Sequence, residues 1–468
     1  MKPEFFIFLF AYFVLILLVS FAFAQRMRSI EDFFLASRNL SSGFIYLSLT
    51  AAWFGATSIL VSTDEALESG ISSFWLMGVP AVATVLILAV FLSKPLHRLP
   101  IMTLSDLAEL RYGKTVRHMA SVLIIWYMMV LASSQMVALG NFLKTFLGLP
   151  YLFCLALGTS VVLVYSIFGG LRSVVITDCF QFFFLLAGTF LLFFYLLGQS
   201  SFQQISAATL LSGKIGYFDF FHHFKENFLT ALSFTLAWTI SPIALQRIQA
   251  ARGVRQAQRG LWATAGTLFM LYGVVVCVGI LSLPLFHTQK LEAPLVSEVI
   301  ASRVGVFFGG LLFAAVISAV MSTMDTAINT GALVLTRDFY QQIFPSREAR
   351  RIVSASRLAT FFVGTTAFLI ATRFQSILKT LGLSSEIMAE GFFIPGLAMI
   401  FLRRRMPLAG LLSLSLGGGF SLLSFLGAMN VLPFRLPVWP HSLPYGLGLS
   451  LFGFLAGFAM EGMKCKQK

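Results

Sequence analysis

Long runs of apolar residues, separated by short polar connections, recur from one end of the chain to the other. A helix that crosses the bilayer core needs about 20 such residues. No linker or shift in composition divides the sequence, so we predict a single all-α, polytopic membrane domain over residues 1–468. It contains about thirteen spans, at 3–24, 42–66, 73–95, 117–146, 150–169, 173–197, 226–247, 260–286, 304–336, 353–373, 375–402, 406–430 and 444–462.

The first segment also has features of a signal peptide. It begins after Lys2 and ends in Ala22-Phe23-Ala24, which resembles a cleavage site. Its apolar stretch is long for a signal, however, and Arg26 and Arg28 follow at once, which disfavours export. We therefore expect a first helix that is retained.

The composition agrees with this pattern. Hydrophobic residues make up 58% of the chain and charged residues 11%, whereas soluble domains carry roughly 25% charged residues. These values exclude a soluble globular enzyme and a disordered chain. The four Cys residues have no paired spacing, so the sequence indicates neither a disulfide framework nor a cysteine metal site.

The net charge of +14 is sorted by position. If the N-terminus lies outside the cell, most of the 33 Lys and Arg residues fall in connections on the cytoplasmic side, where basic residues concentrate in membrane proteins. Arg98, Arg247 and Arg403-Arg404-Arg405 are examples. We therefore predict a multi-pass protein of the cell membrane with its C-terminus in the cytoplasm. The charge then requires no nucleic acid as a partner.

Two of the predicted helices carry features that break a helix. Small and polar residues surround Gly55 in the second segment, and Pro242 in the seventh cannot donate the backbone hydrogen bond that would go to Trp238. Each alone is also consistent with a kink or with close helix packing. Together they lie five segments apart and run in opposite directions. This pattern is typical of a secondary transporter with two inverted halves, here about 42–197 and 226–402.

The ninth segment offers oxygen ligands for a cation. Ala319, Ser322 and Thr323 have helical spacing and therefore share one face. Two hydroxyls and a nearby carbonyl suit a hard cation such as Na⁺. Alternatively, the hydroxyls bond back to carbonyls of their own helix.

Two aspartates lie in or beside apolar spans. Asp325 is in the ninth segment next to Thr326, where a carboxylate is costly unless it faces protein or water. Asp178 begins the sixth segment. By the predicted topology both lie toward the cytoplasm, so they are candidates for one ion path. Asp178 is equally well explained as a helix cap, a role for which Thr177 competes.

Glu386 and Glu390 lie one helical turn apart in the eleventh segment, where they either bind substrate or a proton or line a wet vestibule. No enzyme or ATPase motif accompanies these groups. The sequence contains neither GxxxxGK[ST] nor HExxH, and its six His residues are dispersed. We predict a membrane transporter that is not an enzyme and has no cofactor.

In order and spacing, these motifs resemble the sodium:solute symporter family, which includes sodium/proline, sodium/sugar, sodium/pantothenate and sodium/sialic acid carriers. The resemblance covers most of the chain and is strongest in the ninth segment. The matching stretches are Phe33–Arg38, Ala51–Gly70, Gly169–Gln181, Pro242–Arg259, Ala319–Thr326 and Thr336–Tyr340.

The resemblance implies a leucine-transporter-type fold, with a 5+5 inverted repeat, one helix before it and two after it. It also implies a sodium site formed by the backbone carbonyls of Ala51, Phe54 and Ala319 and the hydroxyls of Ser322 and Thr323. Some members bind a second sodium ion, for which the matching positions are Ser322, Asp325, Thr326 and Asp178. Members with that site have serine where this chain has Asp325, so both the binding of an ion and the binding of a proton remain alternatives for this residue.

The solute site implied by the resemblance lies beside the sodium. Proline carriers have an aspartate where this chain has Trp53, which argues against proline. No Lys or Arg lies at mid-depth in the second, fourth or seventh segment, so a carboxylate solute would depend on helix ends or sodium. The expected solute-binding residues are Trp53, Gly55, Ala56, Gln135, Trp238 and Ser241.

We therefore predict Na⁺-coupled symport of a small polar organic solute into the cell by alternating access. Coupling follows if sodium favours the outward-open state. A proton-coupled symporter that uses Asp325 or Glu390 is one alternative. A transporter-like sensor or passive pathway is another, and a membrane-embedded enzyme is the weakest.

Overall fold

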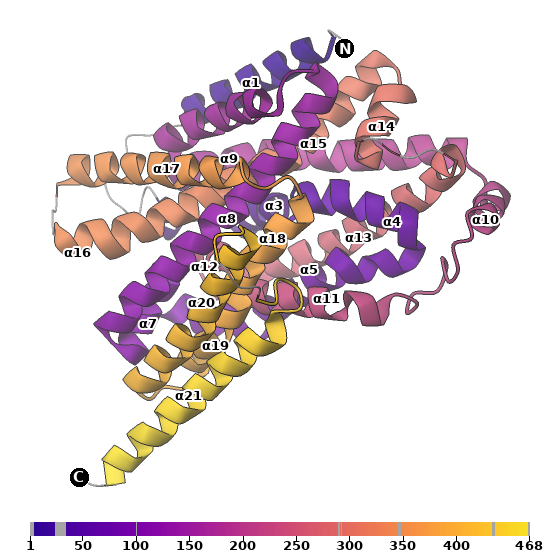
Figure 1. Ribbon diagram of the computed structural model, residues 1–468. Coiled ribbons are helices and arrows are strands. Elements are labelled where there is room, and N and C mark those ends of the chain that lie inside the picture. Colours follow the sequence, from indigo (N-terminus) through magenta and orange to yellow (C-terminus); the bar gives the residue numbers. More distant parts are fainter. Residues whose placement is uncertain are drawn as a thin grey trace.

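The computed structural model describes residues 4–23, 34–99, 101–288, 291, 293–344, 348–432 and 436–466. Within these ranges the chain is helical, apart from turns, loops and one isolated β-bridge between Leu40 and Ala251. In Figure 1 the short helix α10 (Phe202–Leu211) lies at the right end of the bundle and α14 (Leu295–Ser302) at its upper right, while the C-terminus lies at the lower left.

The helices of the first half follow the predicted apolar runs. A capping box starts one of the shorter helices, α7: the Thr103 hydroxyl accepts from the backbone N–H of Asp106 at 3.1 Å, and the Asp106 carboxylate accepts from the Thr103 N–H. The helices are α1 (Glu4–Phe23), η1 (Ala36–Arg38), α3 (Ser42–Trp53), η2 (Thr57–Val61), α4 (Ser62–Ser69), η3 (Gly70–Ser73), α5 (Phe74–Ile87), η4 (Leu88–Leu92), α6 (Ser93–Arg98), α7 (Leu104–Tyr112), α8 (Lys114–Leu147), α9 (Tyr151–Gln199) and α10.

The second half repeats the alternation of long spans and short connecting helices. Its longest helices are α13 and α15, both of which come after the second break. The helices are α11 (Phe224–Thr239), α12 (Pro242–Ala250), α13 (Val254–Phe286), α14, α15 (Val306–Leu335), η5 (Thr336–Tyr340), α16 (Gln341–Ile343), α17 (Ala349–Ala371), α18 (Ile377–Glu386), η6 (Ile387–Phe392), α19 (Phe393–Phe401), α20 (Pro407–Ala428) and α21 (Leu443–Lys466).

Both predicted helix breaks are present. The first broken helix begins with α3, which ends at Trp53 because Phe54 has φ −95° and ψ 69°, outside the helical region. The second break separates α11 from α12 at Ile240 and Ser241. Pro242 is the first residue of α12, a position that needs no backbone N–H, and the Ser241 hydroxyl caps that helix by accepting from the N–H of Ala244.

A third interruption lies within α9, between the predicted spans 150–169 and 173–197. Gly170 has φ 57° and ψ −170°, a conformation that residues with a side chain rarely adopt. The glycine therefore lets one span end and the next begin without a connecting loop.

Twelve helical stretches in the described part are long and apolar enough to cross a membrane, compared with the predicted number of about thirteen. The difference arises at the predicted segment 42–66. Its first half, α3, has only 12 residues before the break, and its second half runs on into the next span as the single stretch Thr57–Arg98. The other stretches coincide with predicted segments.

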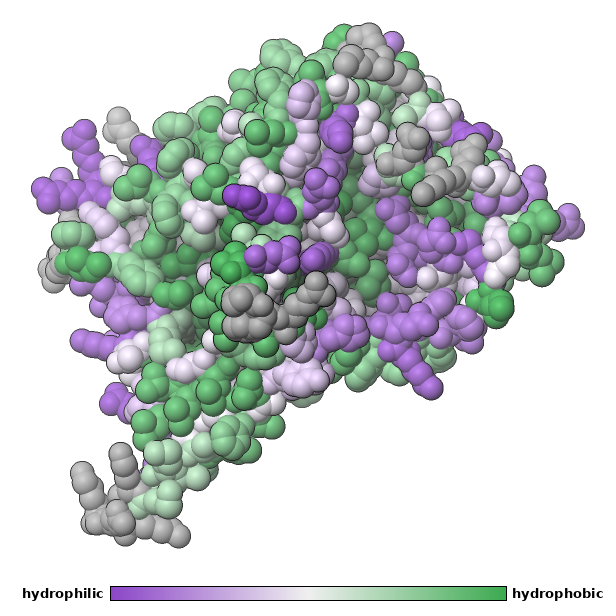
Figure 2. All heavy atoms as spheres, in the orientation of Figure 1, coloured by the Kyte–Doolittle hydropathy of each residue, from purple (hydrophilic) through white to green (hydrophobic). Residues whose placement is uncertain are grey.

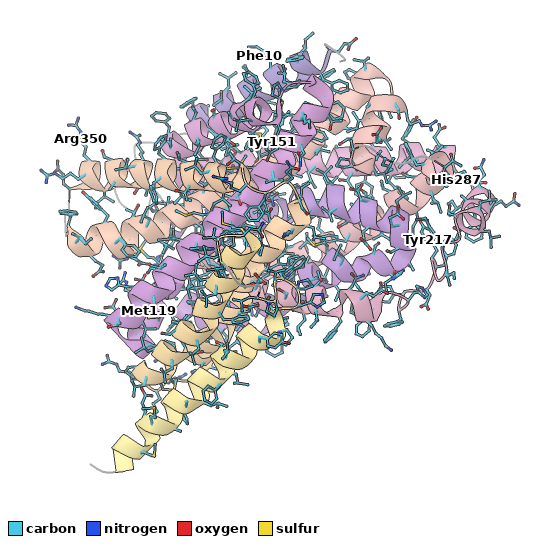
Figure 3. The ribbon with its side chains drawn as sticks, viewed as in Figure 1. Phe10, Met119, Tyr151, Tyr217, His287 and Arg350 are labelled. Atoms are coloured by element: carbon cyan, nitrogen blue, oxygen red, sulfur yellow. The ribbon has the colours of Figure 1, made fainter. Side chains whose placement is uncertain are left out.

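The helix α15 lies at the centre of the bundle. It packs against α8, α9 and α3, and its residues from Gly309 to Val334 are almost all buried. The outer helices instead expose apolar side chains, such as Phe10 on α1, which points away from the bundle (Figure 3). Figure 2 shows apolar side chains over much of the visible face, with hydrophilic ones gathered mainly toward its left and right ends. This is the surface expected of a membrane protein.

Arg117, an arginine of the predicted cytoplasmic connections, is a buried ion-pair partner. Arg117, at the start of α8, is 4% exposed. Its guanidinium pairs with Asp338 at 2.7 Å, with Asp106 at 3.0 Å and with Glu109. These contacts join α7 and α8 to η5, the continuation of α15.

Candidate functional site

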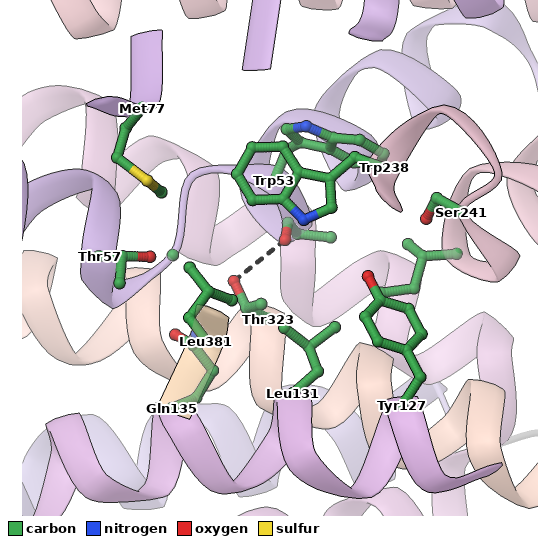
Figure 4. A pocket seen from close by; sticks show the side chains of 13 residues that line it. Trp53, Thr57, Met77, Tyr127, Leu131, Gln135, Trp238, Ser241, Thr323 and Leu381 are labelled. Atoms are coloured by element: carbon green, nitrogen blue, oxygen red, sulfur yellow. Dashed lines mark hydrogen bonds between the residues drawn. The ribbon is translucent and has the colours of Figure 1, made fainter. Parts of the chain in front are cut away.

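A small cavity, with a volume of about 40 Å³, lies where the two broken helices face α8 and α15. Tyr127, Leu131 and Gln135 line it at four-residue intervals along α8, so they share one helix face (Figure 4). None of the described residues that line the cavity is charged. The lining consists of Ala52, Trp53, Gly55, Thr57, Met77, Tyr127, Leu131, Gln135, Trp238, Ser241, Ile243, Thr323 and Leu381.

Two tryptophans, one from each broken helix, form an aromatic wall. The rings of Trp53 and Trp238 meet edge to face, with centroids 6.3 Å apart. Trp238 also stacks on Phe234 at 4.9 Å, which holds its ring in place. The indole N–H of Trp53 is buried and has no hydrogen-bond partner among the described residues. Such a donor is available to a polar solute.

Gln135 joins α8 to the first break. Its Oε1 accepts from the backbone N–H of Ala56 at 3.0 Å, and its Nε2 donates to the Ser134 hydroxyl at 3.1 Å. Ala56 is fully buried and is not among the lining residues. Of the six residues predicted to bind solute, five line the cavity, and Ala56 contacts it through Gln135.

The predicted sodium ligands meet between α3 and α15. The Ser322 hydroxyl donates to the Ala51 carbonyl at 2.9 Å and lies 3.1 Å from that of Ala319. Thr323 donates to the Ala52 carbonyl at 3.0 Å, the dashed line in Figure 4. The carbonyls of Ala51 and Ala52 are available because the last four carbonyls of a helix have no partner within it.

Phe54, the remaining predicted sodium ligand, lies at the break itself. Its N–H closes the last turn of α3 on Thr50, and its ring packs against Tyr272 at 5.2 Å. Ala52 was not among the predicted ligands, although it has the same unpaired position at the end of α3 as Ala51. The helix-end rule applied to every residue of the last turn would have identified it.

Glycine at position 55 lets three helices approach closely. A Cβ there would lie 2.6 Å from the Thr323 hydroxyl and 2.9 Å from Gln135 Oε1. We expect Gly55→Ala to push the first break away from α8 and α15 and to weaken sodium and solute binding together, by at least tenfold each. Gly43→Ala, where the added Cβ meets only the hydroxyl of Ser41 at 3.9 Å, is the matched control.

Binding of radiolabelled sodium to the purified Gly55→Ala protein measures this effect. Sodium affinity equal to that of the Gly43→Ala control would show that close approach at position 55 is not required.

The predicted ion path is brought together around an arginine. Asp178 and Arg247 are both completely buried, and Arg247 Nη2 lies 3.3 Å from Asp178 Oδ2. The same nitrogen donates to the Thr326 hydroxyl at 2.8 Å, and Ser48 donates to Asp178 at 2.5 Å. Asp178 is therefore an ion-pair partner in the interior, where the sequence left a helix cap or an ion path open.

Asp325 lies in the same region. Its Oδ2 accepts from the Tyr165 hydroxyl at 2.6 Å, and its Oδ1, like that of Asp178, has no hydrogen-bond partner among the described residues. Ser322, also predicted for a second cation site, bonds to Ala51 and Ala319 instead. The cluster thus holds two carboxylates and one guanidinium, and its formal charge is negative when both carboxylates are ionised.

Arg247 is the main residue of this region that sequence reasoning missed. Its place at the end of an apolar run, among other basic residues, predicts a cytoplasmic surface charge. The α12 helix instead turns it inward, where it also donates to the Gln246 side chain at 3.1 Å. Only the long-range pairing with Asp178 distinguishes it from its basic neighbours.

A model of the sodium:solute symporter family matches residues 33–418. The chain belongs to this family. The symporter is 24% identical over 417 residues to the sodium/glucose cotransporter of Vibrio parahaemolyticus, which covers 80% of this chain and 75% of that relative. It is 25% identical to the sodium/proline symporter of Staphylococcus aureus, over 77% and 73% of the two chains. The human sodium/iodide cotransporter is 26% identical, over 74% of this chain and 56% of that protein.

Solved structures agree on the fold of the symporter. A substrate-bound, outward-open Na⁺-coupled sialic acid symporter matches with a TM-score of 0.77 at 16% identity, over 96% of each chain. The nucleobase-cation-symport-1 transporter Mhp1, closed around bromovinylhydantoin, matches with a TM-score of 0.55 at 15% identity, over 93% of this chain and 95% of its own. The predicted leucine-transporter-type fold, with α1 before the repeats and α20 and α21 after them, is confirmed.

Proposed function

We propose that this Na⁺-coupled symporter binds sodium between α3 and α15 and binds its solute in the adjacent cavity. The observation that carries the proposal is the contact of Ser322 and Thr323 with the carbonyls of Ala51 and Ala52. Of these residues, Ala52 and Thr323 line the cavity. A hydroxyl that donates its proton to a carbonyl keeps its lone pairs free for a cation. Ala51, Phe54, Ala319, Ser322 and Thr323 are the proposed ligands.

Sodium at this position links a broken helix of the first half to the central helix of the second. Binding there strengthens the contact between α3 and α15 and so holds the first break in the shape that lines the cavity. Solute binding then depends on sodium, and the reverse follows by reciprocity. This dependence allows a sodium gradient to drive solute uptake when the cavity opens alternately to the two sides.

The chemistry of the cavity lining suits a small polar organic solute. Aromatic rings cover its apolar surfaces, while the unpaired Trp53 N–H and the polar side chains of Tyr127 and Gln135 offer hydrogen bonds. The capped N-terminus of α12 at Ser241 adds a partial positive charge, which favours an anionic or electron-rich group on the solute. Trp53, Gly55, Ala56, Gln135, Trp238 and Ser241 are its proposed contacts.

The buried cluster of Asp178, Asp325 and Thr326 remains our proposal for a second cation site or an ion path. Arg247 offsets one of its two negative charges. The remaining carboxylate attracts one monovalent cation or one proton, which distinguishes this site from the neutral ligands of the first.

We also propose that one transport unit extends over the whole chain, with repeats at about 42–197 and 226–402. In the proposed orientation the N-terminus lies outside and the C-terminus in the cytoplasm, as the distribution of basic residues favours.

A solute panel tests this function. We expect one or more small polar solutes to raise the thermal stability of the purified protein in sodium but not in potassium. A bound solute at a hundred times its dissociation constant contributes about 2.7 kcal/mol. Trp238→Ala should remove the solute-induced shift, whereas Trp262→Ala, which changes a half-exposed ring on α13, should leave it. Solute shifts of equal size in both salts would contradict coupling at this site.

A further inference from the structure

Glu386 and Glu390 lie away from the proposed sodium ligands, where the core meets the two helices that follow it. Glu386 is the last residue of α18, and Glu390 lies in the π-helical turn η6. Both α20 and α21 pack against η6. The side chains of both glutamates are completely buried. π-Helical turns occur frequently at functional sites.

The two carboxylates differ in their hydrogen bonds. Glu386 accepts from the hydroxyl of Ser424 at 3.3 Å and from that of Ser442. Neither oxygen of Glu390 has a hydrogen-bond partner among the described residues. An unpaired buried carboxylate is a costly group that a structure keeps only when something else compensates it.

Two glycines allow the neighbouring helices to approach Glu390 closely. A Cβ added at Gly446 of α21 would lie 2.2 Å from Glu390 Oε2, and one added at Gly417 of α20 would lie 2.2 Å from the Glu390 backbone oxygen. The carboxylate therefore rests against the backbone of α21, shielded from solvent.

No cation offsets these two acids in the described part of the protein. The helices α19 and α20 carry no charged residue. The first turn of α18 carries Lys379, and the first turn of α11 carries Lys225 and Glu226. On α21, Glu461 binds the N–H of Leu408.

The helix α8 also packs against η6. Its charged residues lie in its terminal turns, and among them Arg117 already pairs with Asp338. The remaining titratable groups of α8 are His118, which follows Arg117, and Tyr127, which lines the cavity. Those of α21 are Tyr445, which is exposed near its start, and Lys464, Cys465 and Lys466 at its C-terminal end. None of these groups whose side chain the structure describes forms an ion pair with either glutamate.

We propose that Glu386 and Glu390 form a proton-binding site. Two neighbouring carboxylates that are buried without a cation repel each other when both are ionised, and each loses its hydration. One bound proton removes the repulsion and leaves a single charge, which the hydroxyls of Ser424 and Ser442 stabilise at Glu386. A proton also needs no shell of oxygen ligands.

Packed rings connect this site to the cavity. The loop that contains Ser442 also contains Trp439, whose indole N–H donates to Ser233 at 3.2 Å. The Trp439 ring lies 5.5 Å from Phe234, which stacks on Trp238 of the cavity wall. Loss of the proton changes the hydrogen bond between Glu386 and Ser442 of this loop. The resulting movement of the loop is transmitted through the packed rings to the cavity wall. This second step rests on the proposed function of the cavity.

Infrared difference spectroscopy of the purified protein tests the site directly. At neutral pH we expect a carbonyl band of a protonated carboxylic acid in the wild type that is lost or shifted in Glu390→Gln and in Glu386→Gln. Glu65→Gln, which changes a carboxylate bound by Ser69 on α4, should leave this band unchanged. A wild-type spectrum that differs from neither variant in this region would overturn the proposal.

Binding of radiolabelled sodium to the same preparations separates this proposal from the proposed function. We expect the glutamine variants to bind sodium as the wild type does. We also expect the tryptophan fluorescence of the wild type to change with pH, and this change to be lost in the glutamine variants. Absence of sodium binding in the wild type would overturn the proposed function alone. Displacement of the carboxylic acid band by sodium would overturn the assignment to a proton.

Discussion

Replacing Ser322 with Ala and Thr323 with Val should lower sodium affinity by about a hundredfold or more. The two hydroxyls are the side-chain oxygens that join α15 to the end of α3, at 2.9 Å from Ala51 and 3.0 Å from Ala52. A hydrogen bond or ligand contact to a charged group contributes about 1.5–3 kcal/mol, and each 1.4 kcal/mol corresponds to about tenfold in affinity. Equilibrium binding of radiolabelled sodium to the purified variant measures the effect.

The matched control removes two buried hydroxyls elsewhere. Ser282 and Thr189 each donate to a carbonyl of their own helix, on α13 and α9. Ser282→Ala with Thr189→Val should therefore keep wild-type sodium affinity. If the Ser322 and Thr323 variant also kept it, the sodium ion would have to bind elsewhere.

Replacing Arg247 with Met should lower the free energy of unfolding by about 3–5 kcal/mol, the usual cost of removing one partner of a buried ion pair. The side chain is completely buried and donates to Asp178, Thr326 and Ser48. Met fills a similar volume but leaves Asp178 as an uncompensated charge in the protein interior. A denaturant titration of the purified protein in detergent measures this decrease in the free energy of unfolding.

A second substitution identifies the cause of that loss. Asp178→Asn in the Arg247→Met background removes the remaining charge and should restore much of the stability. Arg351→Met, which breaks an exposed ion pair with Glu348 at the start of α17, should cost at most about 1 kcal/mol. A double variant no more stable than Arg247→Met would show that the charge of Asp178 is not what Arg247 offsets.

The spans are predictable from the sequence because the bilayer imposes a simple rule on length and polarity. The breaks are predictable for a related reason. Pro242 cannot donate the backbone hydrogen bond that would continue a helix through its position. Gly55 lies in a cluster of small residues that a lipid-facing span does not need. That Ser322 and Thr323 share one face follows from helical spacing alone, because it is a local property of α15.

The interior charges are not predictable in this way. Arg247 and Asp178 lie 69 positions apart, and Tyr165 and Asp325 lie 160 apart. Nothing in the local sequence of either pair specifies its partner. Glu390 is a similar case, because the fit of its carboxylate against Gly446 depends on how α21 packs after the core is formed.

Uptake into proteoliposomes is the measurement that tests sodium coupling at this site most directly. The transported compound is the solute that stabilises the purified protein only in sodium. With sodium outside, we expect accumulation above the external solute concentration, and loss of that accumulation when sodium is equal on both sides or when Ser322 and Thr323 are replaced. Accumulation that is unchanged without a sodium gradient would contradict sodium coupling through the contact between α3 and α15.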